Sequence, residues 1–285
     1  MQHMPYPLMA RSKHYTVVDL ATAVMLDRRH PKELREAMRL GKWTAPTAGL
    51  APGFAQANLV ILPRENAYDF LLFCQRNPRP CPLIEVTEVG SSEPTGVAPG
   101  ADLRTDLPKY RIYRNGALAE EPTDVTAHWR DDLVSFLLGC SFTFERALLD
   151  TGIPLRHIEE GKNVAMWRTS TACRPAGRFH GPMVVSMRPI PHELVSKAVT
   201  VTARFAMAHG APVHVGDPAA LGIRDLARPD YGDATEVRAG EVPVFWACGV
   251  TPQAVALTAK LPFIITHSPG HMFLTDLPDH AFSVL

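Results

Sequence analysis

The sequence predicts a mixed α/β fold built around a mostly parallel β-sheet. A buried strand, an amphipathic helix and a second strand follow one another with short turns between residues 56 and 89, which is the order of an α/β unit. From Pro191 onward, strands that are apolar throughout alternate with helices. Such strands are typical of parallel sheets that are covered on both faces.

In the first part of the chain, Pro31 and Gly41 mark the two ends of a short helix. Proline suits the first helical position and glycine the position after the last turn. The apolar run QANLVIL, which ends at Pro63, is typical of a buried strand. In chain order, we expect helices at 17–25 and 31–40, a strand at 56–62, a helix at 67–75 and a strand at 83–89.

The middle of the chain begins with a connector at 91–108 that is rich in Gly, Pro, Ser and Asp. Asn115 and Gly116 tolerate the positive φ that a two-residue hairpin turn requires. Acidic residues at Asp131 and Asp132 suit the amino end of a helix, because the helix dipole favours negative charge there. We therefore expect strands at 110–113 and 117–120 and a helix over 131–150 that the segment 139–145 interrupts.

The last part of the chain has the most regular alternation of helices and strands, and no internal repeat is evident in the sequence. We expect strands at 164–168 and 183–187, a helix at 192–205, a strand at 212–215, a short helix at 217–221, a strand at 242–248, a helix at 251–260 and strands at 263–266 and 272–275.

Composition excludes several classes of protein. The chain has 285 residues, enough for one or two domains and a large core. Lys plus Arg and Asp plus Glu both number 29, so the balanced charge gives no electrostatic footprint for nucleic acid or an anionic membrane. The amino-terminal residues lack the apolar segment of a signal peptide, and no apolar run approaches the ~18 residues of a membrane helix. We expect a soluble, cytoplasmic protein.

The five cysteines are scattered, odd in number and without a CxxC pair. This pattern is neither a disulfide framework nor a zinc-finger spacing and indicates a reducing compartment. His267 and His271 are four residues apart, but Ser-Pro-Gly between them forbids the helix that a paired-histidine zinc motif requires. We predict no metal ion and no cofactor.

The loop CRPAGRFHGPM, from Cys173 to Met183, combines cations with prolines and glycines. Arg174 and Arg178 offer planar forks for a carboxylate, His180 can exchange a proton near neutral pH, and Gly181 allows a ligand to approach the backbone. The loop is therefore a candidate binding site. The alternative is a structural loop whose arginines pair with acids of the protein itself.

Further candidates lie where predicted strands end, which is where α/β sheets bind ligands. They are His214 and Asp217, Cys248 and Thr251, and His267 and His271. Thr251 precedes Pro252 and is expected to cap a helix whose free N–H groups could hold an anion. The pKa of the Cys248 thiol could be lowered there. The alternatives are a small buried thiol, an ordinary cap and a hydrogen-bonded His–Asp pair.

The segment GCSFTFE, residues 139–145, carries two possible nucleophiles, Cys140 and Ser141, without the flanking pattern of a nucleophile elbow. Glu145 is a candidate acid or base if it is buried near the arginines. The alternative is an exposed helix carboxylate.

Several long strings resemble the hydro-lyase family that contains D-glutamate cyclase. They are QANLVILP (56–63), FCQRNPRPCPL (73–83), GADLRTDLPKYR (100–111), WRDDLVSFLLGCSFTFE (129–145), CRPAGRFHGPMVVSMRP (173–189), HGAPVHVGDPAALGI (209–223), GEVPVFWACGVTPQAV (240–255) and ITHSPGHMFLTDL (265–277). The resemblance covers nearly the whole chain from about Arg11. Ala45, Ser170 and Ser268 depart from the usual glycine, asparagine and alanine, and Ser170 in a pocket would alter substrate choice.

The resemblance implies a three-layer α/β/α sheet domain with a second, smaller α+β domain. We assign residues 1–108 and 190–285 to the sheet domain and 109–189 to the smaller one. It also implies a lyase that removes water, with cyclisation of D-glutamate to 5-oxo-D-proline as the best-named activity. A dehydratase of another small hydroxy- or amino-acid, and a module that binds a carboxylate without turnover, remain open alternatives.

Cyclisation requires a base for the amine, a proton donor for the departing water and donors for the oxyanion. Our hypothesis gives the substrate carboxylates to Arg174 and Arg178, the proton transfers to His180 or His214, and the oxyanion to the helix start at Thr251. Further candidates for the pocket are Cys140, Glu145, Ser170, Gly181, Asp217, Cys248, His267 and His271. The expected partner is a small carboxylate, with neither nucleic acid nor membrane, and self-association is left open.

Overall fold

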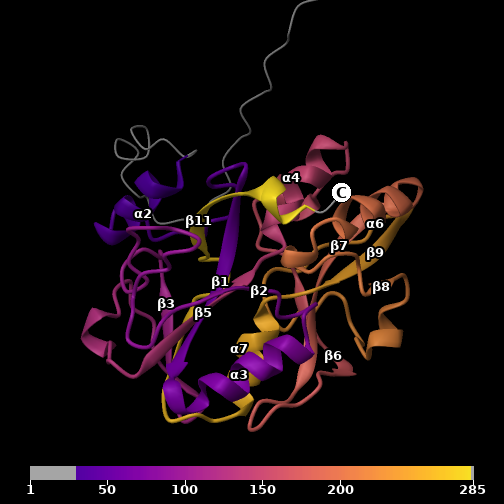
Figure 1. Cartoon of the computed structure of the whole chain (residues 1–285). Helices are drawn as coiled ribbons and strands as arrows, with labels where there is room; N and C mark the ends of the chain where they lie inside the picture. Colours follow the sequence, from indigo (N-terminus) through magenta and orange to yellow (C-terminus); the bar gives the residue numbers. More distant parts are fainter. Residues whose placement is uncertain (1–29, 284–285) are drawn as a thin grey trace, which may run out of the picture.

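The computed structural model describes residues 30–283 (Figure 1). The helix predicted at 17–25 lies outside this range. The described helices are α2 (Pro31–Arg39), α3 (Arg64–Arg76), α4 (Phe142–Asp150), α5 (Arg156–Glu159), α6 (Val195–Ala203) and α7 (Val250–Thr258), with 3-10 turns at Thr126–His128, His192–Leu194, Ala206–Ala208, Pro218–Leu221 and Asp279–Phe282. None of the described helices has the length and apolar character needed to cross a membrane.

The strands form two sheets. Sheet A contains β1 (Phe54–Pro63), β2 (Leu83–Val86), β3 (Tyr110–Arg114), β4 (Ala117–Glu120), β5 (Leu133–Gly139), β10 (Ile264–His267) and β11 (Phe273–Pro278). Its order is β2-β5-β1-β10-β3-β4, and β11 also pairs with β1. Sheet B contains β6 (Met166–Ala172), β7 (Pro182–Pro191), β8 (His214–Val215) and β9 (Glu241–Ala247), in the order β6-β7-β9-β8.

The expectation of a mostly parallel sheet is wrong, because every described strand pair is antiparallel. The strands are apolar throughout because both faces of each sheet are covered. Helices cover one face, and largely irregular segments such as 97–107 and 221–223 cover the other. Burial on both faces suffices to produce the pattern, whatever the strand direction. The mixed α/β class itself is confirmed.

The fold contains an internal repeat that the sequence did not reveal. The order strand, helix, strand, strand, helix, strand occurs twice, as β1-α3-β2-β5-α4-β6, with the β3–β4 hairpin inserted after β2 and α5 inserted after α4, and as β7-α6-β8-β9-α7-β10. The first three strands are arranged alike, as β2-β5-β1 in sheet A and β8-β9-β7 in sheet B. The registers also correspond, since Ala57 pairs with Gly139 and Val185 pairs with Ala247.

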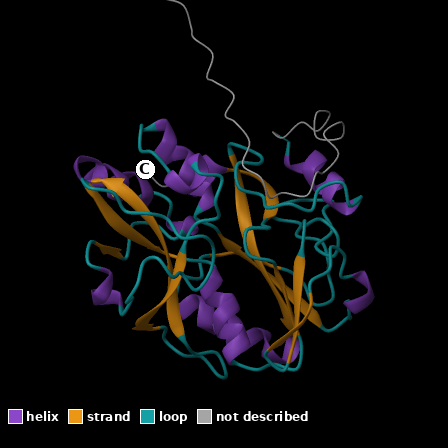
Figure 2. Ribbon diagram, turned by 180° about the vertical axis from the view of Figure 1, so that it is seen from behind, coloured by secondary structure: helices purple, strands orange, loops and turns teal. Residues whose placement is uncertain are grey.

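The two repeats exchange their last strands. Strand β6 follows α4 in the first repeat but pairs with β7 of the second, and β10 follows α7 in the second repeat but pairs with β1 of the first. Helix α7 likewise shares a hydrophobic core with α3 on sheet A, and α4 shares one with α6 on sheet B. Figure 2 shows the strands of the two sheets with helices between them. Each half is therefore completed by the other.

Most predicted elements are confirmed, with ends that differ by a few residues. In the hairpin, Asn115 and Gly116 have φ values of 53° and 81°, as the turn requires. The helix predicted over 131–150 is wrong in its first half, because residues 133–139 form the buried strand β5 and the helix starts at Phe142. An apolar run of this length fits a buried strand as well as a buried helix, so periodicity alone could not decide.

The predicted domain boundaries do not follow the sheets. Sheet A takes strands from residues 54–139 and 264–278, and sheet B takes strands from 166–247. Strands β3, β4 and β5, which we assigned to the smaller domain, belong to the sheet of β1. As a division into domains, the assignment stays a prediction.

Candidate functional site

Two equivalent strand-to-helix turns lie at the centre of the repeat. Strand β5 leads through Cys140 and Ser141 into α4, and β9 leads through Cys248 and Gly249 into α7. The sequences GCSFT and ACGVT, residues 139–143 and 247–251, therefore occupy equivalent places. In each turn a threonine in the first turn of the helix binds the neighbouring long strand.

These threonine bonds fix the two helix starts against the sheets. The Oγ1 of Thr143 accepts from the backbone N–H of Gln56 at 3.4 Å, and that of Thr251 accepts from Val184 at 2.9 Å. Thr251 was expected to cap its helix, and this is wrong. The cap residue is Gly249, and the Thr251 hydroxyl bonds across to β7 instead.

Both turns line one cavity, which we call the twin-turn cavity. The space that water-sized centres can occupy in it is about 30 Å³, more than the ~10–15 Å³ that one water molecule needs. It lies where β1, β5, β9 and β10 meet the segments around Asn163 and Gly270. The lining residues are Asn58, Cys140, Ser141, Phe142, Asn163, Val164, Met166, Cys248, Gly249, Val250, His267, Gly270 and Met272.

The two thiols of the cavity are protonated at neutral pH. Burial raises the pKa of Cys140 to about 12 and that of Cys248 to about 11. Backbone N–H groups of Phe142 and Val250 act in the opposite direction but are outweighed by burial. Cys248 Sγ also lies 3.4 Å from the sulfur of Met166. The expectation that the helix start lowers the pKa of Cys248 is therefore wrong.

His267 brings a neutral imidazole to the cavity. Burial lowers the pKa of His267 to about 4. Its Nδ1 lies 3.0 Å from the backbone nitrogen of Leu59 and 3.3 Å from the Leu59 carbonyl oxygen, and the shorter contact, in which the Leu59 N–H donates, assigns the proton to Nε2. The Nε2 of Gln253 is 3.0 Å from both ring nitrogens, which places it over the face of the ring. The imidazole can therefore donate a hydrogen bond from Nε2, while the lone pair on Nδ1 accepts from the backbone of Leu59.

Asn58 and Gly249 are in close contact within the cavity wall. The Asn58 side chain donates to the carbonyl oxygen of Gly139 at 2.8 Å. A Cβ added at Gly249 would lie 2.1 Å from Asn58 Nδ2, so only glycine fits beside this amide. This contact ties the β9–α7 turn to β1, and the Asn58 bond ties β1 to the β5–α4 turn.

Glu145 belongs to α4 and is buried, but it does not line the twin-turn cavity. Its Oε1 accepts from Arg188 Nη2 at 2.5 Å and lies 3.1 Å from His157 Nε2. These cations outweigh the effect of burial, and the pKa of Glu145 falls to about 2. Arg188 also donates to Ser141 Oγ at 3.0 Å, which connects the pair to the cavity wall.

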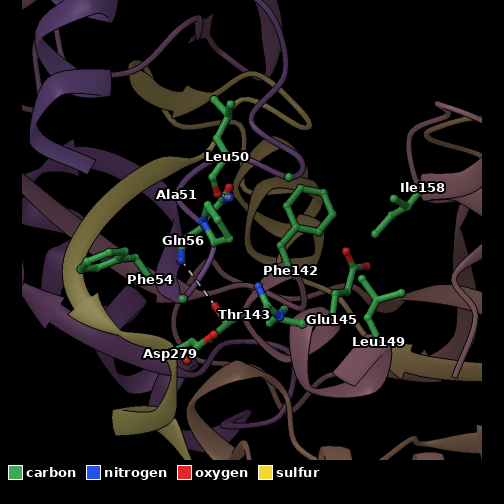
Figure 3. A pocket seen from close by; sticks show the side chains of 14 residues that line it. Leu50, Ala51, Phe54, Gln56, Phe142, Thr143, Glu145, Leu149, Ile158 and Asp279 are labelled. Carbon is green, nitrogen blue, oxygen red and sulfur yellow. Dashed lines mark hydrogen bonds between the residues drawn. The ribbon is translucent and has the colours of Figure 1, made fainter. Parts of the chain in front are cut away.

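A second pocket lies on the other side of Phe142 (Figure 3). It is formed by the loop 49–54, the first turns of α4, Ile158 and Asp279, and Gln56 and Glu145 also line it. Phe142 lines both pockets and therefore forms the partition between them.

The loop that carries Arg174, Arg178 and His180 lies elsewhere. All three side chains are exposed, while Phe179 between them is fully buried and anchors the loop. The Asn77 side chain holds the backbone of Arg174 with two hydrogen bonds of 2.8 Å. Ser170, Cys173, His180 and Gly181 line an open hollow on this face.

The remaining candidates are dispersed. His214 lies on β8, the outer strand of sheet B, and its Nε2 is 2.7 Å from the backbone oxygen of Asp217. The Asp217 carboxylate caps the 3-10 turn Pro218–Leu221. His271 bonds to the carbonyl oxygen of Pro269. Among the described residues, no three His, Cys, Asp or Glu side chains are grouped to hold a metal ion.

Of the residues predicted from sequence, the structure brings Cys140, Cys248 and His267 together in one cavity. Sequence reasoning missed Asn58, Asn163 and Gly249 as partners of this site. The available signal was the short similarity between GCSFT and ACGVT, which becomes recognisable once both are known to follow a buried strand.

Fold and cavity define an α/β protein of two interlocked repeats, with a small, mostly apolar cavity where the repeats meet. The chain matches the D-glutamate cyclase family over residues 134–276. It is 64% identical over 255 residues to a "Putative hydro-lyase" of Stutzerimonas stutzeri, covering 90% of this chain and 96% of that one. It is 66% identical over 249 residues to "Putative hydro-lyase Teth514_1597" of Thermoanaerobacter, covering 87% and 94%.

A third relative, "Putative hydro-lyase YcsI" of Bacillus subtilis, is 59% identical over 255 residues, covering 90% of this chain and 99% of that one. The chain belongs to the D-glutamate cyclase family, whose relatives carry the names of hydro-lyases.

Proposed function

We propose that this protein is a hydro-lyase that cyclises D-glutamate to 5-oxo-D-proline, and that the reaction takes place in the twin-turn cavity. The observation that carries the proposal is the convergence of two helix starts, two protonated thiols and a neutral imidazole in one small cavity. Family membership supports removal of water, and the site chemistry supports a carboxylic acid as the substrate.

The two helix starts suit an anion. Helices α4 and α7 are each nine residues long. Their first N–H groups, those of Phe142 and Val250, bond to the sulfurs of Cys140 and Cys248, and the next ones, of Thr143 and Thr251, bond to backbone carbonyl oxygens. The dipoles of both helices place partial positive charge at the cavity. A substrate carboxylate can therefore be held without a lysine or arginine in the wall, and none lines the cavity.

The reaction needs proton donors where its oxygen leaves. The α-amine forms a C–N bond with the δ-carbon, which is the carbon of the side-chain carboxyl group, a C–O bond of that carboxyl breaks, and two protons from nitrogen leave with the oxygen as water. The thiols of Cys140 and Cys248 and the Nε2–H of His267 are donors at neutral pH. Fixed donors of this kind stabilise the charge that develops on the tetrahedral oxygen.

The exposed loop with Arg174, Arg178 and His180 remains a second proposed location for substrate binding. It offers cations but an open surface, where interactions between charges are weakened by water. The side chains of Cys140, Cys248 and His267 in the twin-turn cavity are buried, and we therefore favour that cavity. The cytoplasmic location also stays a prediction.

Formation of 5-oxoproline from D- and L-glutamate, followed by NMR, tests the proposal. We expect turnover of D-glutamate and a loss of about 100-fold or more in kcat for Cys140→Ala and Cys248→Ala, because each removes a donor at the reacting oxygen. Cys81→Ala is the matched control, since the Cys81 thiol is equally buried but lies in a different core.

Full activity in both cavity variants would refute the site. A large loss in Arg178→Ala and His180→Ala instead would move it to the loop. No turnover of either enantiomer, together with water loss from another small hydroxy- or amino-acid, would replace cyclase by dehydratase.

A further inference from the structure

We propose that the second pocket is a binding site for a small organic cation, whose ammonium group is held by Glu145 and whose carbon chain packs on the apolar wall of the pocket. The pocket lies on the other side of Phe142 from the twin-turn cavity, and the proposed reaction makes no use of it. The inference therefore stands or falls independently of the proposed cyclase.

The second pocket has room for a small organic molecule. The space that water-sized centres can occupy in it is about 210 Å³, compared with about 30 Å³ in the twin-turn cavity. A cavity of roughly 150 Å³ is sufficient to bind benzene. A ligand of several non-hydrogen atoms therefore fits in the second pocket.

Glu145 brings a carboxylate with one unpaired oxygen to this pocket. Its neighbouring cations all contact Oε1, since Arg188 donates from Nε at 3.1 Å and from Nη2 at 2.5 Å, and His157 Nε2 lies 3.1 Å away. Within residues 30–283, no hydrogen bond reaches Oε2. In Figure 3 the carboxylate points toward Ile158, which lines the same pocket. The carboxylate is ionised at neutral pH, because the pKa of Glu145 is about 2, and Oε2 can therefore accept from an ammonium group.

Gln56 provides a second acceptor that has no partner. Its Nε2 donates to the carbonyl oxygens of Thr47 at 3.0 Å and Leu50 at 3.1 Å, and these two bonds fix the orientation of the amide. Its Oε1 is buried and accepts no hydrogen bond from the part of the chain that the structure describes. Buried polar atoms in native proteins are nearly always hydrogen-bonded. An unpaired acceptor in the wall of a pocket therefore indicates a bound molecule that supplies the donor.

The charged residues of the lining favour a cation. Asp279 also lines the pocket, and its carboxylate forms no ion pair with any described residue. Arg146 is the basic residue of the lining, and its Nε donates to Asp150 at 2.7 Å. Arg188, the buried partner of Glu145, does not line the pocket. The pocket thus presents two carboxylates and one guanidinium that is already paired.

The rest of the wall suits a carbon chain. Leu149 and Ile158 are large apolar side chains that are 42% and 40% exposed, and they line the pocket together with Leu50 and Phe142. A hydrocarbon chain packed against them removes apolar surface from water on both sides of the contact. The ligand class is therefore a primary ammonium compound with a short apolar chain, which is found in alkylamines and in apolar amino acids.

Ligand-observed NMR and calorimetry with the full-length protein test the inference. The probe is 1-butylamine, and its neutral and anionic counterparts are 1-butanol and butanoate. We expect 1-butylamine to bind more tightly than either counterpart by about tenfold or more, because a charge-assisted hydrogen bond to Oε2 is available to the cation alone. D- and L-norvaline distinguish the two sources of the ammonium group. Equal binding of norvaline and 1-butylamine would assign the site to both sources, and weaker binding of norvaline would assign it to amines.

Two variants locate the binding site. Glu145→Gln keeps the shape of the side chain and removes its charge, so binding of 1-butylamine should weaken by about tenfold or more while that of 1-butanol stays unchanged. Because Glu145 also pairs with buried Arg188, Ile158→Trp provides a second test. Ile158 is exposed, so the larger ring should fill the pocket and abolish binding without disturbing the core. Leu71→Trp is the matched control, since Leu71 is 38% exposed on α3 and lies outside the lining.

Leu71→Trp should bind 1-butylamine as wild type does. Equal affinities of wild type for 1-butylamine and 1-butanol would overturn the inference, and so would undiminished binding of 1-butylamine by Ile158→Trp. Preference for butanoate would overturn it as well. Binding of 1-butylamine by a protein that does not cyclise D-glutamate would support the inference and remove only the proposed function.

Discussion

At the scale of the residue, Glu145, Arg188 and His157 form one of the buried charged groups of the described chain. Arg188 is fully buried, and its guanidinium also lies over the rings of Phe144 and Trp246. Removing one member of such a group leaves an uncompensated charge, which costs more than the intact group contributes. This group therefore stabilises the position of α4, and the turn that precedes α4 lines the twin-turn cavity.

The depressed pKa of Glu145 predicts a defined loss of stability in acid. The folded pKa of about 2 lies below the unfolded value of about 4.3. The unfolded state therefore binds the proton first, so the stabilisation is complete above about pH 4.3 and is lost as the pH falls toward 2. Between pH 5 and 2, the free energy of unfolding of wild type should fall by about 3 kcal/mol more than that of Glu145→Gln.

Chemical denaturation at several pH values measures this difference. The exposed Glu159→Gln substitution provides the control and should leave the pH profile of wild type unchanged. Parallel profiles for wild type and Glu145→Gln would show that the carboxylate is not held ionised by its neighbours.

At the scale of the element, each of the two helix starts is attached to a sheet by the hydroxyl of a threonine, and the two hydrogen bonds differ in length. The Thr251 hydroxyl is fully buried and bonds to β7 at 2.9 Å, whereas the bond from β1 to Thr143 is 3.4 Å long. A bond near the optimum distance contributes more than one at the limit. The β9–α7 turn is therefore the more tightly held of the pair.

Threonine-to-valine substitutions at the two positions compare these attachments. Valine keeps the shape and leaves a backbone N–H without its acceptor, which costs about 1–3 kcal/mol when the group is buried. We expect Thr251→Val to lower the free energy of unfolding by more than Thr143→Val does. Urea titrations of the two variants measure it, and an equal or reversed order would contradict the bond geometry.

The sequence predicted individual elements well and their assembly poorly. The hairpin at Asn115 and Gly116 and the strand that ends at Pro63 follow from local chemistry that no tertiary contact has to supply. The sequence predicted a helix where strand β5 lies, because this segment is nearly continuous in apolar residues and shows no alternation of apolar and polar positions. The pairing of β10 with β1 joins residues more than 200 positions apart, and that of β5 with β1 joins residues 70 or more positions apart, so no local pattern encodes them.

The candidate site was predicted in part for the same reason. Cys140, Cys248 and His267 were recognised by residue type and by their position after strands, but not as neighbours. Arg174 and Arg178 were predicted to bind substrate because an exposed structural arginine and a substrate-binding arginine cannot be told apart in a sequence. Asn58 lies inside an apolar strand, where a single polar residue gives little signal until its contact with Gly249 is seen.

At the scale of the whole molecule, the exchanged strands predict that neither half folds alone. A first fragment ending near residue 178 contains β6 but lacks its partner β7, and it also lacks β10 and β11 on the edge of β1. The second fragment lacks β6. Unpaired long strands expose backbone groups that need partners.

We expect each fragment by itself to be largely unfolded and an equimolar mixture to regain the near-UV circular dichroism of the intact chain. Intact protein should unfold in one cooperative transition as followed by circular dichroism and by fluorescence. A fragment with sharp thermal unfolding of its own, or two separate transitions in the intact protein, would show that the halves are independent.

The way in which the two halves are connected also limits how a molecule reaches the twin-turn cavity. Proteins that bind a ligand between two lobes often open by a hinge, but a hinge between sheets A and B would have to bend the twin turns themselves, because each turn joins a strand of one sheet to a helix that packs on the other. Phe142 lines both the second pocket and the twin-turn cavity, so movement of this one side chain would connect the two spaces. An opening of that size would favour a compact acid over a peptide or a nucleotide.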